Sequence, residues 1–116
     1  MVDIMTDDYT RVSKMNEGRI IFFSHSLTTY YTQAEKLCLE FIRTHYPNYY
    51  IINPRDIALE HHWDFDACMR HLLPEVQRCE ILFWYKDDSH SPGVDTEIAE
   101  AHRLGKQVRE LTLCPS

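Results

Sequence analysis

Two short, uninterrupted apolar runs limit most strongly what this chain can fold into. Residues 19–24 read RIIFFS and residues 80–85 read EILFWY. A strand with one face in water alternates apolar and polar side chains, whereas a strand covered on both faces of a parallel sheet is apolar throughout. Both runs therefore predict central strands of a parallel sheet.

The rest of the chain alternates between predicted helices and predicted strands. Three segments have helical signals, at residues 29–45, 64–76 and 92–105, and two shorter apolar segments, at 49–53 and 107–111, complete the set of strands. The first helix has an apolar stripe with the spacing i, i+3, i+4, formed by Tyr30, Ala34, Leu37, Cys38, Phe41 and Ile42. Asp64 is placed to cap the second helix, and Pro74 should kink or split it.

This alternation predicts the fold class, because parallel neighbours must be joined by crossover connections. We expect an α/β protein with a doubly wound, mostly parallel four- to five-stranded sheet and helices on both faces, similar to flavodoxin or Rossmann folds. With 116 residues and 44% hydrophobic content, one core accounts for the chain. Residues 17–116 are predicted to form this single domain, after a loosely ordered tail at residues 1–16.

The composition disfavours several classes of function. A formal net charge of -6 argues against nucleic-acid binding, which depends on clustered Lys and Arg. The four cysteines form no C-x-x-C pair and the seven histidines no ligand spacing, so we expect reduced thiols, no metal and no cofactor. The first 17 residues are polar and no later run is long enough for a membrane span, which predicts a cytoplasmic protein without a membrane partner.

Polar residues follow each predicted strand, where ligands bind in open parallel sheets. The candidates for ligand contact, in chain order, are Ser24, His25 and Ser26, then Arg55 and Asp56, then Tyr85 at the end of the third strand. Asp87 and Asp88 follow as candidate catalytic carboxylates. Tyr85 could stack on a base, although a core position is the commoner role for such a residue, and the two acids could equally be solvated loop residues.

The sharpest signal lies at the start of the last helix. Ser91 can serve as the N-cap, Pro92 suits the first helical position, and Gly93 lets a ligand approach the exposed backbone N–H groups. At about 100° per residue, Glu97 falls between Ala101 and Leu104 on the side that should face the sheet. A buried carboxylate is costly unless it is paired or used, so Glu97 is the strongest catalytic candidate. The alternative is a position at the edge of the stripe, from which Glu97 reaches solvent or pairs with a base such as Arg55.

These residues resemble a known family. The pattern P-G-V-x-x-E-I-x-x-A-x-x-x-G-K-x-V, which runs from Pro92 to Val108, is similar to the nucleoside 2-deoxyribosyltransferase-like superfamily. That superfamily includes the deoxynucleoside-monophosphate N-glycosidases. The similarity is clear from about Met69 to Leu111, looser from Arg19 to Asp56, and absent from the N-terminal tail.

The resemblance implies an N-glycosidic bond hydrolase or transferase that acts on a nucleoside or nucleotide, in a protein that can form homodimers. Glu97 matches the family's nucleophile, which attacks the anomeric carbon of the sugar. The loop at residues 24–29 contains no glycine, so its hydroxyls and His25 would have to hold any phosphate. The alternatives are a non-catalytic module for a nucleotide-derived ligand and, from the stretch Phe23-Ser24-His25-Ser26, a domain resembling the TIR domains that cleave NAD or bind NAD-derived signals.

Overall fold

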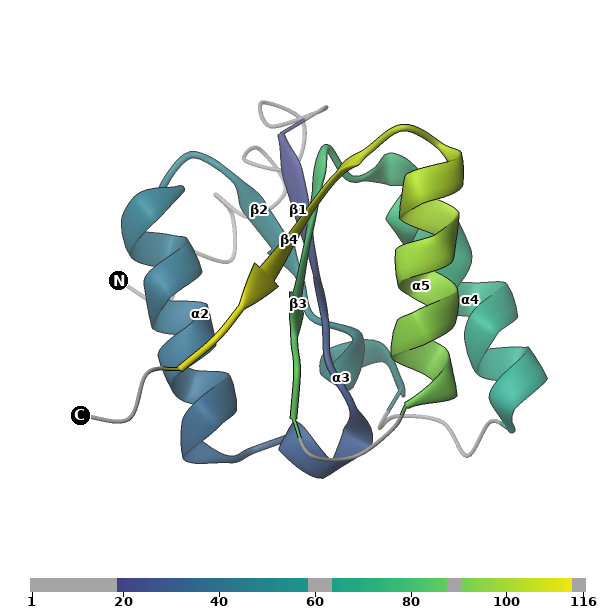
Figure 1. Ribbon diagram of the computed structural model, residues 1–116, viewed down its shortest axis with the longest axis horizontal. Helices are drawn as coiled ribbons and strands as arrows, with labels where there is room; N and C mark the ends of the chain where they lie inside the picture. Colours follow the sequence, from purple (N-terminus) through teal and green to yellow (C-terminus); the bar gives the residue numbers. More distant parts are fainter. Residues whose placement is uncertain (1–18, 59–63, 88–90, 114–116) are drawn as a thin grey trace, which may run out of the picture.

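The computed structural model describes residues 19–58, 64–87 and 91–113. The predicted tail at residues 1–16 therefore lies outside the described residues. Four described strands form one parallel sheet in the order β2-β1-β3-β4 (Figure 1): β1 is Ile20–Ser24, β2 Tyr50–Ile52, β3 Ile81–Tyr85 and β4 Gln107–Leu111. The predicted fold class is confirmed, and all four predicted strands are present within two residues of their predicted ends.

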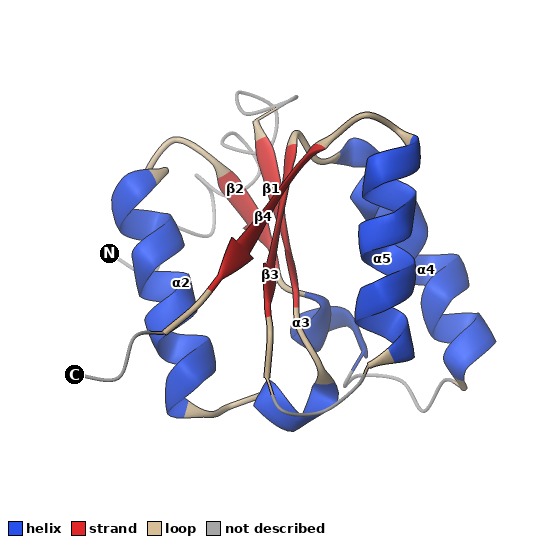
Figure 2. Cartoon of the chain, viewed as in Figure 1, coloured by secondary structure: helices blue, strands red, loops and turns tan. Residues whose placement is uncertain are grey.

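Helices cover both faces of the sheet (Figure 2). Helix α2 (Gln33–His45) lies on one face, and α4 (Phe65–Arg78) and α5 (Pro92–Arg103) lie on the other. Successive residues of β1 alternate between two core clusters: Ile20 and Phe22 join the cluster on the α4 and α5 side, and Ile21 and Phe23 join the one beneath α2. This double burial explains why β1 has no polar residue before Ser24.

Helix α2 begins later than predicted. Thr32 caps it by accepting a hydrogen bond from the Glu35 backbone N–H at 3.3 Å, and the first helical residue is Gln33 rather than Thr29. Leu27–Thr29 instead forms a 3-10 turn, and Tyr31 has a positive φ of 62°. A left-handed residue cannot continue an α-helix, so the chain turns before α2 starts.

The buried stripe of α2 also differs from the predicted one. Its buried side chains are Glu35, Cys38, Leu39 and Ile42, whereas Leu37 and Phe41 are exposed. The true stripe is rotated from the predicted one and contains a carboxylate. The predicted amphipathic helix is present, and Cys38 and Ile42 are buried as predicted, but the predicted burial of Leu37 and Phe41 is wrong because the prediction gave weight to apolar residues alone.

Two other helices depart from expectation at prolines. Pro74 was predicted to kink or split the second helix, and the split is wrong, because α4 continues from Phe65 to Arg78 with Pro74 inside it. Asp64 caps α4 as predicted, accepting a hydrogen bond from the Ala67 N–H at 2.8 Å. A short helix that was not predicted, α3 (Pro54–Ala58), begins at the proline that ends β2.

Helix α5 ends at Arg103, and Gly105 lies beyond it with a φ of 73°. The Lys106 N–H donates to the Ala101 carbonyl and the Gly105 N–H to the His102 carbonyl, which is the Schellman arrangement. The prediction that the helix reaches Gly105 was therefore slightly too long. Glycine suits this position because the left-handed conformation is strained for residues with a Cβ.

Cys38, Cys68 and Cys79 are free thiols, as predicted, and Cys38 and Cys79 are buried in the core. No helix of the described ranges is both long enough and apolar enough to cross a membrane.

The packing of α2 predicts a large difference between two substitutions on this helix. Ile42 has no exposed surface, so Ile42→Ala should lower the free energy of unfolding by about 2–5 kcal/mol. Leu37 is 40% exposed, and Leu37→Ala should cost less than about 1 kcal/mol. Urea denaturation of the two variants measures both effects. Equal losses would contradict the assignment of the buried stripe.

Candidate functional site

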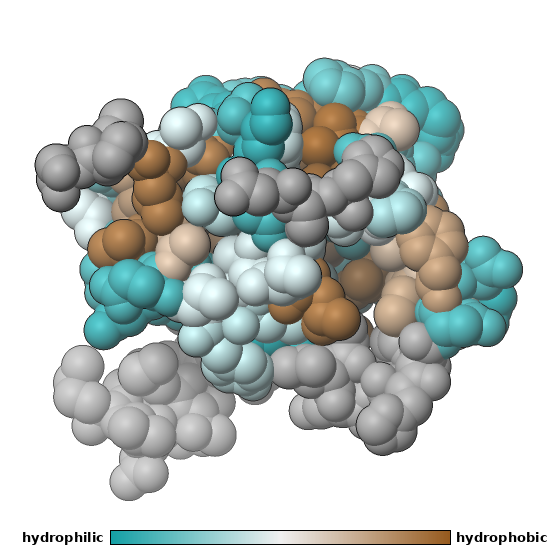
Figure 3. Space-filling model, turned by 60° about the horizontal axis from the view of Figure 1, so that its bottom comes forward, coloured by the Kyte–Doolittle hydropathy of each residue, from teal (hydrophilic) through white to brown (hydrophobic). Residues whose placement is uncertain are grey.

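The order of the strands defines where a ligand site is expected. Strand β1 pairs with β2 on one side and β3 on the other, and the chain leaves β1 toward α2 but leaves β3 toward α5, on the opposite face of the sheet. The loops that follow β1 and β3 therefore lead to opposite faces of the sheet, and a ligand crevice is expected at the carboxyl ends of these strands, which is the usual ligand position in such folds. In Figure 3 this edge has come forward, and its middle is covered by residues of intermediate hydropathy.

Glu97 is buried next to the end of β1. Its side chain points inward from α5 and is only 3% exposed, and Ser24 at the end of β1 donates a hydrogen bond to Oε1 at 2.6 Å. The helical-wheel prediction that Glu97 faces the sheet is confirmed. The alternative pairing with Arg55 is not formed, because that guanidinium bonds Glu35 and Asp56.

Burial raises the pKa of Glu97 from its ordinary value of 4.5 to about 7, although the hydrogen bond from Ser24 partly opposes this effect. Near neutral pH the carboxyl group is therefore divided between its protonated and ionised forms. Such a group can release or accept a proton at little cost, a property found in many catalytic carboxyl groups.

Asp87, just past the end of β3, holds the loop that follows β1. Its Oδ2 accepts hydrogen bonds from three hydroxyls: that of Ser26, that of Thr28 at 2.8 Å and that of Thr29 at 2.6 Å. The predicted site residues Ser26 and Asp87 are thus in direct contact. The contact joins the two loops that border the crevice.

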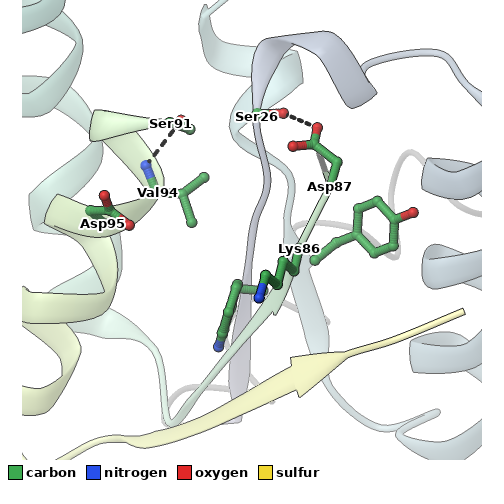
Figure 4. Close-up of a pocket in the computed structure, with 8 residues that line it drawn as sticks. Ser26, Lys86, Asp87, Ser91, Val94 and Asp95 are labelled. Carbon is green, nitrogen blue, oxygen red and sulfur yellow. Dashed lines mark hydrogen bonds between the residues drawn. The ribbon is translucent and has the colours of Figure 1, made fainter. Parts of the chain in front are cut away.

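A cavity of about 190 Å³ opens between the end of β3 and the start of α5 (Figure 4). Its lining comprises Ser26, Trp84, Tyr85, Lys86, Asp87, Ser91, Val94 and Asp95. Ser91 caps α5 as predicted, accepting a hydrogen bond from the Val94 N–H at 3.3 Å. Glu97 is not among the lining residues. It lies one helical turn beyond Val94, and its partner Ser24 is paired in register with the lining residue Trp84.

A second buried carboxylate, Glu35, lies beneath the loop on the α2 side. Its Oε2 is 2.8 Å from His25 Nε2, and its Oε1 accepts bonds from Arg55 Nη1 at 2.5 Å and the Tyr31 N–H at 3.0 Å. Burial would raise the pKa of Glu35, but the bonds from His25 and Tyr31 and the charges of His25 and Arg55 outweigh it and lower the pKa. The sequence prediction missed Glu35, although it lies on one stripe with Cys38, Leu39 and Ile42.

His25 faces an acceptor with each ring nitrogen. Nδ1 is 2.9 Å from the Phe23 carbonyl oxygen, and Nε2 faces the Glu35 carboxylate. Burial lowers the pKa of His25, while both acceptors favour the protonated ring, since only that form donates from both nitrogens. His25 thus serves to hold the loop against α2, and its ring is completely buried.

The remaining predicted residues fall into three groups. Arg55 bonds Asp56 through Nη2 at 3.0 Å, and both lie on the α2 and α3 side of the crevice rather than at the cavity beside α5. Tyr85 lines that cavity. Asp88 lies outside the described residues, so its predicted role is untested by the structure.

Tyr30 is a residue that the sequence analysis assigned to the core. It lies near Glu97, and burial together with the Glu97 charge raises the pKa of its phenol. Its ring also meets that of His25 edge-on, with centroids 5.1 Å apart. No sequence pattern indicated that Tyr30 lies near Glu97, because the two residues are far apart in the chain and only the fold brings them together.

No model of a known protein family matches the chain, and a search of curated proteins finds no match. Within the described ranges, no group of three or more His, Cys, Asp or Glu side chains is arranged to hold a metal ion.

The raised pKa of Glu97 predicts a pH-dependent stability. A pKa that rises from 4.5 to about 7 on folding corresponds to about 3 kcal/mol, since one pKa unit is about 1.4 kcal/mol. The folded state binds the proton more tightly, so this stabilisation is complete below pH 4.5 and is lost as the pH rises through 7. Glu97→Gln should remove this loss.

Denaturation of the wild type and Glu97→Gln from pH 4 to 8 measures the effect. Relative to the wild type, Glu97→Gln should gain about 3 kcal/mol across this range. Glu100→Gln, a change of a carboxylate in the same helix that bonds Gln77 and Arg103, is the control and should retain the loss of stability attributed to Glu97. If the free energies of unfolding of the wild type and Glu97→Gln changed with pH in parallel, this result would contradict the raised pKa of Glu97.

Gly93 allows a test of whether its small size serves the fold or a ligand. A Cβ at Gly93 would lie 3.5 Å from Met69 Cε and 3.8 Å from Ser91 Oγ, which are ordinary contacts. Gly93→Ala should therefore raise the unfolding free energy by roughly 0.5–1 kcal/mol. Gly105→Ala, at a φ of 73°, should lower it by a similar amount. Thermal denaturation compares the two, and a loss in Gly93→Ala would show that the fold needs this glycine.

Proposed function

We propose that this protein cleaves or transfers an N-glycosidic bond of a nucleoside or nucleotide, with Glu97 as the nucleophile. The observation that carries the proposal is the Glu97 carboxyl group, which is buried at the carboxyl edge of the central strands, has a pKa of about 7 and accepts a hydrogen bond from Ser24. The sequence resemblance described above points to the same residue.

In this mechanism the ionised Glu97 attacks the anomeric carbon of the sugar as the bond to the base breaks. The electron pair of that bond goes to the base nitrogen, which takes a proton from a donor in the site. Water, or a free acceptor base, then displaces Glu97 from the sugar, and the attacking water or base loses a proton. Ser24 keeps the carboxylate oriented through its hydrogen bond to Oε1.

Asp87 fits a positioning role better than that of proton donor. Its Oδ2 already accepts bonds from the hydroxyls of Ser26, Thr28 and Thr29, and these bonds fix the loop that would border the sugar. Asp88, or water, remains the candidate for protonating the base. Lys86 and Ser91 line the cavity beside α5 and would contact the polar end of the substrate.

One observation favours a second candidate function, a binding module for a nucleotide-derived ligand without turnover. The cavity measures about 190 Å³, whereas small-molecule sites commonly measure about 300–1,000 Å³. It would hold a sugar-sized group, and Glu97 is not among its lining residues. Binding without release of base in the assay below would support this second candidate.

The test is release of free base, followed by chromatography, from deoxynucleosides, their monophosphates and NAD. Glu97→Gln should lower turnover by a factor on the order of a thousand or more, without loss of stability at pH 8. Glu100→Gln, a change of a carboxylate in α5 that does not line the cavity, is the control and should retain most of the activity. Full activity in Glu97→Gln would exclude Glu97 as the nucleophile.

The pH dependence gives an independent test of the same proposal. Because the nucleophile must be ionised, kcat/KM should rise with pH through the pKa of Glu97, about 7, and then level off. Initial rates between pH 5 and 9 measure this profile. A rate that falls as the pH rises from 6 to 8 would instead indicate that the protonated carboxyl group is the active form.

A further inference from the structure

A second hollow in the surface lies on the opposite side of the β1 loop from the cavity beside α5. This groove, of about 430 Å³, runs along α2 as far as Arg55. Its lining comprises Tyr31, Thr32, Gln33, Glu35, Lys36, Leu39, Glu40, Arg43 and Arg55, and none of these residues lines the cavity beside α5.

The aromatic ring at one end of this groove is held in an unusual way. Tyr31 is 72% exposed, so burial of its ring does not explain why a tyrosine occupies this position. Its backbone has a φ of 62°, a conformation that glycine or asparagine adopts with less strain. A bulky residue in this conformation persists only where its surroundings fix it, and such positions cluster at ligand sites.

The surroundings of Tyr31 fix both its backbone and its ring. The Tyr31 N–H donates to Glu35 Oε1, and the Arg55 guanidinium lies over the ring, 4.4 Å from its centroid. Arg55 is in turn held by Glu35 and Asp56. The ring is therefore presented to solvent on a rigid base, which suits stacking against a second planar ring.

The charges along the groove indicate which charged group a ligand stacked on Tyr31 would carry. Lys36 and Arg43 are exposed cations seven residues apart on one flank of α2, and Glu40 is the exposed carboxylate between them. The other carboxylate, Glu35, is turned toward His25 and Arg55. An anionic group is thus favoured beside Lys36 and Arg43, in a chain whose net charge is -6.

We propose that this groove binds a small molecule with a planar aromatic ring and an anionic group, with Tyr31 as the stacking platform. The site is separate from the one that contains Glu97. Hydrogen bonds connect Tyr31 through Glu35 to His25, which follows Ser24 in the chain. A ligand bound in the groove would therefore contact residues that hold the loop bordering the first site.

Phenyl phosphate is a suitable probe because it has a ring and an anion but no glycosidic bond. Cyclohexyl phosphate is its matched non-planar control. In amide NMR titrations, phenyl phosphate should shift the signals of residues 31–43 and bind at least about fivefold more tightly than cyclohexyl phosphate. Glu97→Gln should bind it equally, which separates this site from the proposed catalytic one.

Two variants decide the role of Tyr31. In Tyr31→Gly the preference for the planar ring should vanish, while the melting temperature stays equal or rises because glycine relieves the strained backbone. Phe41→Ala, which removes an exposed aromatic residue of α2 that does not line the groove, should leave the preference intact. Equal affinity of the two phosphates for the wild type, or a preference that survives Tyr31→Gly, would overturn the proposal.

Discussion

The pairing of β1 with β3 is the constraint on which the other features of the structure depend. Ile21, Phe22 and Phe23 of β1 and Leu82 of β3 are almost completely buried, so both faces of this pair must be covered. Helix α2 follows β1 on one face and α5 follows β3 on the other. The crevice between the two departing chains results directly from this arrangement.

Two glutamates are buried next to this crevice, and the cost of burial is offset differently for each. Glu35 is surrounded by His25, Arg55 and the Tyr31 N–H, which favour its ionised form. Glu97 has a hydrogen bond from Ser24, and its pKa rises to about 7. Glu35 therefore stabilises the loop after β1, while Glu97 can change its protonation state near neutral pH.

The accuracy of the sequence-based predictions depended on whether the relevant signal was local. The apolar runs of β1 and β3, and the caps Asp64 and Ser91, were predicted from neighbouring residues alone. The start of α2 was wrong because Thr32 and the left-handed Tyr31 compete with helical periodicity. The position of Asp87 depends on hydroxyls 58 to 61 residues away, so no local pattern indicated its partners.

The sequence by itself determined the parallel α/β architecture and the inward direction of Glu97, because the periods of strands and helices dictate which side chains face the core. Only the tertiary structure decided what surrounds that carboxyl group. Ser24 and Glu97 are 73 residues apart in the sequence. They meet because the carboxyl end of β1 and the first half of α5 lie next to each other at one edge of the sheet. Burial by distant elements also sets the pKa of Glu97, since desolvation depends on everything packed around the group.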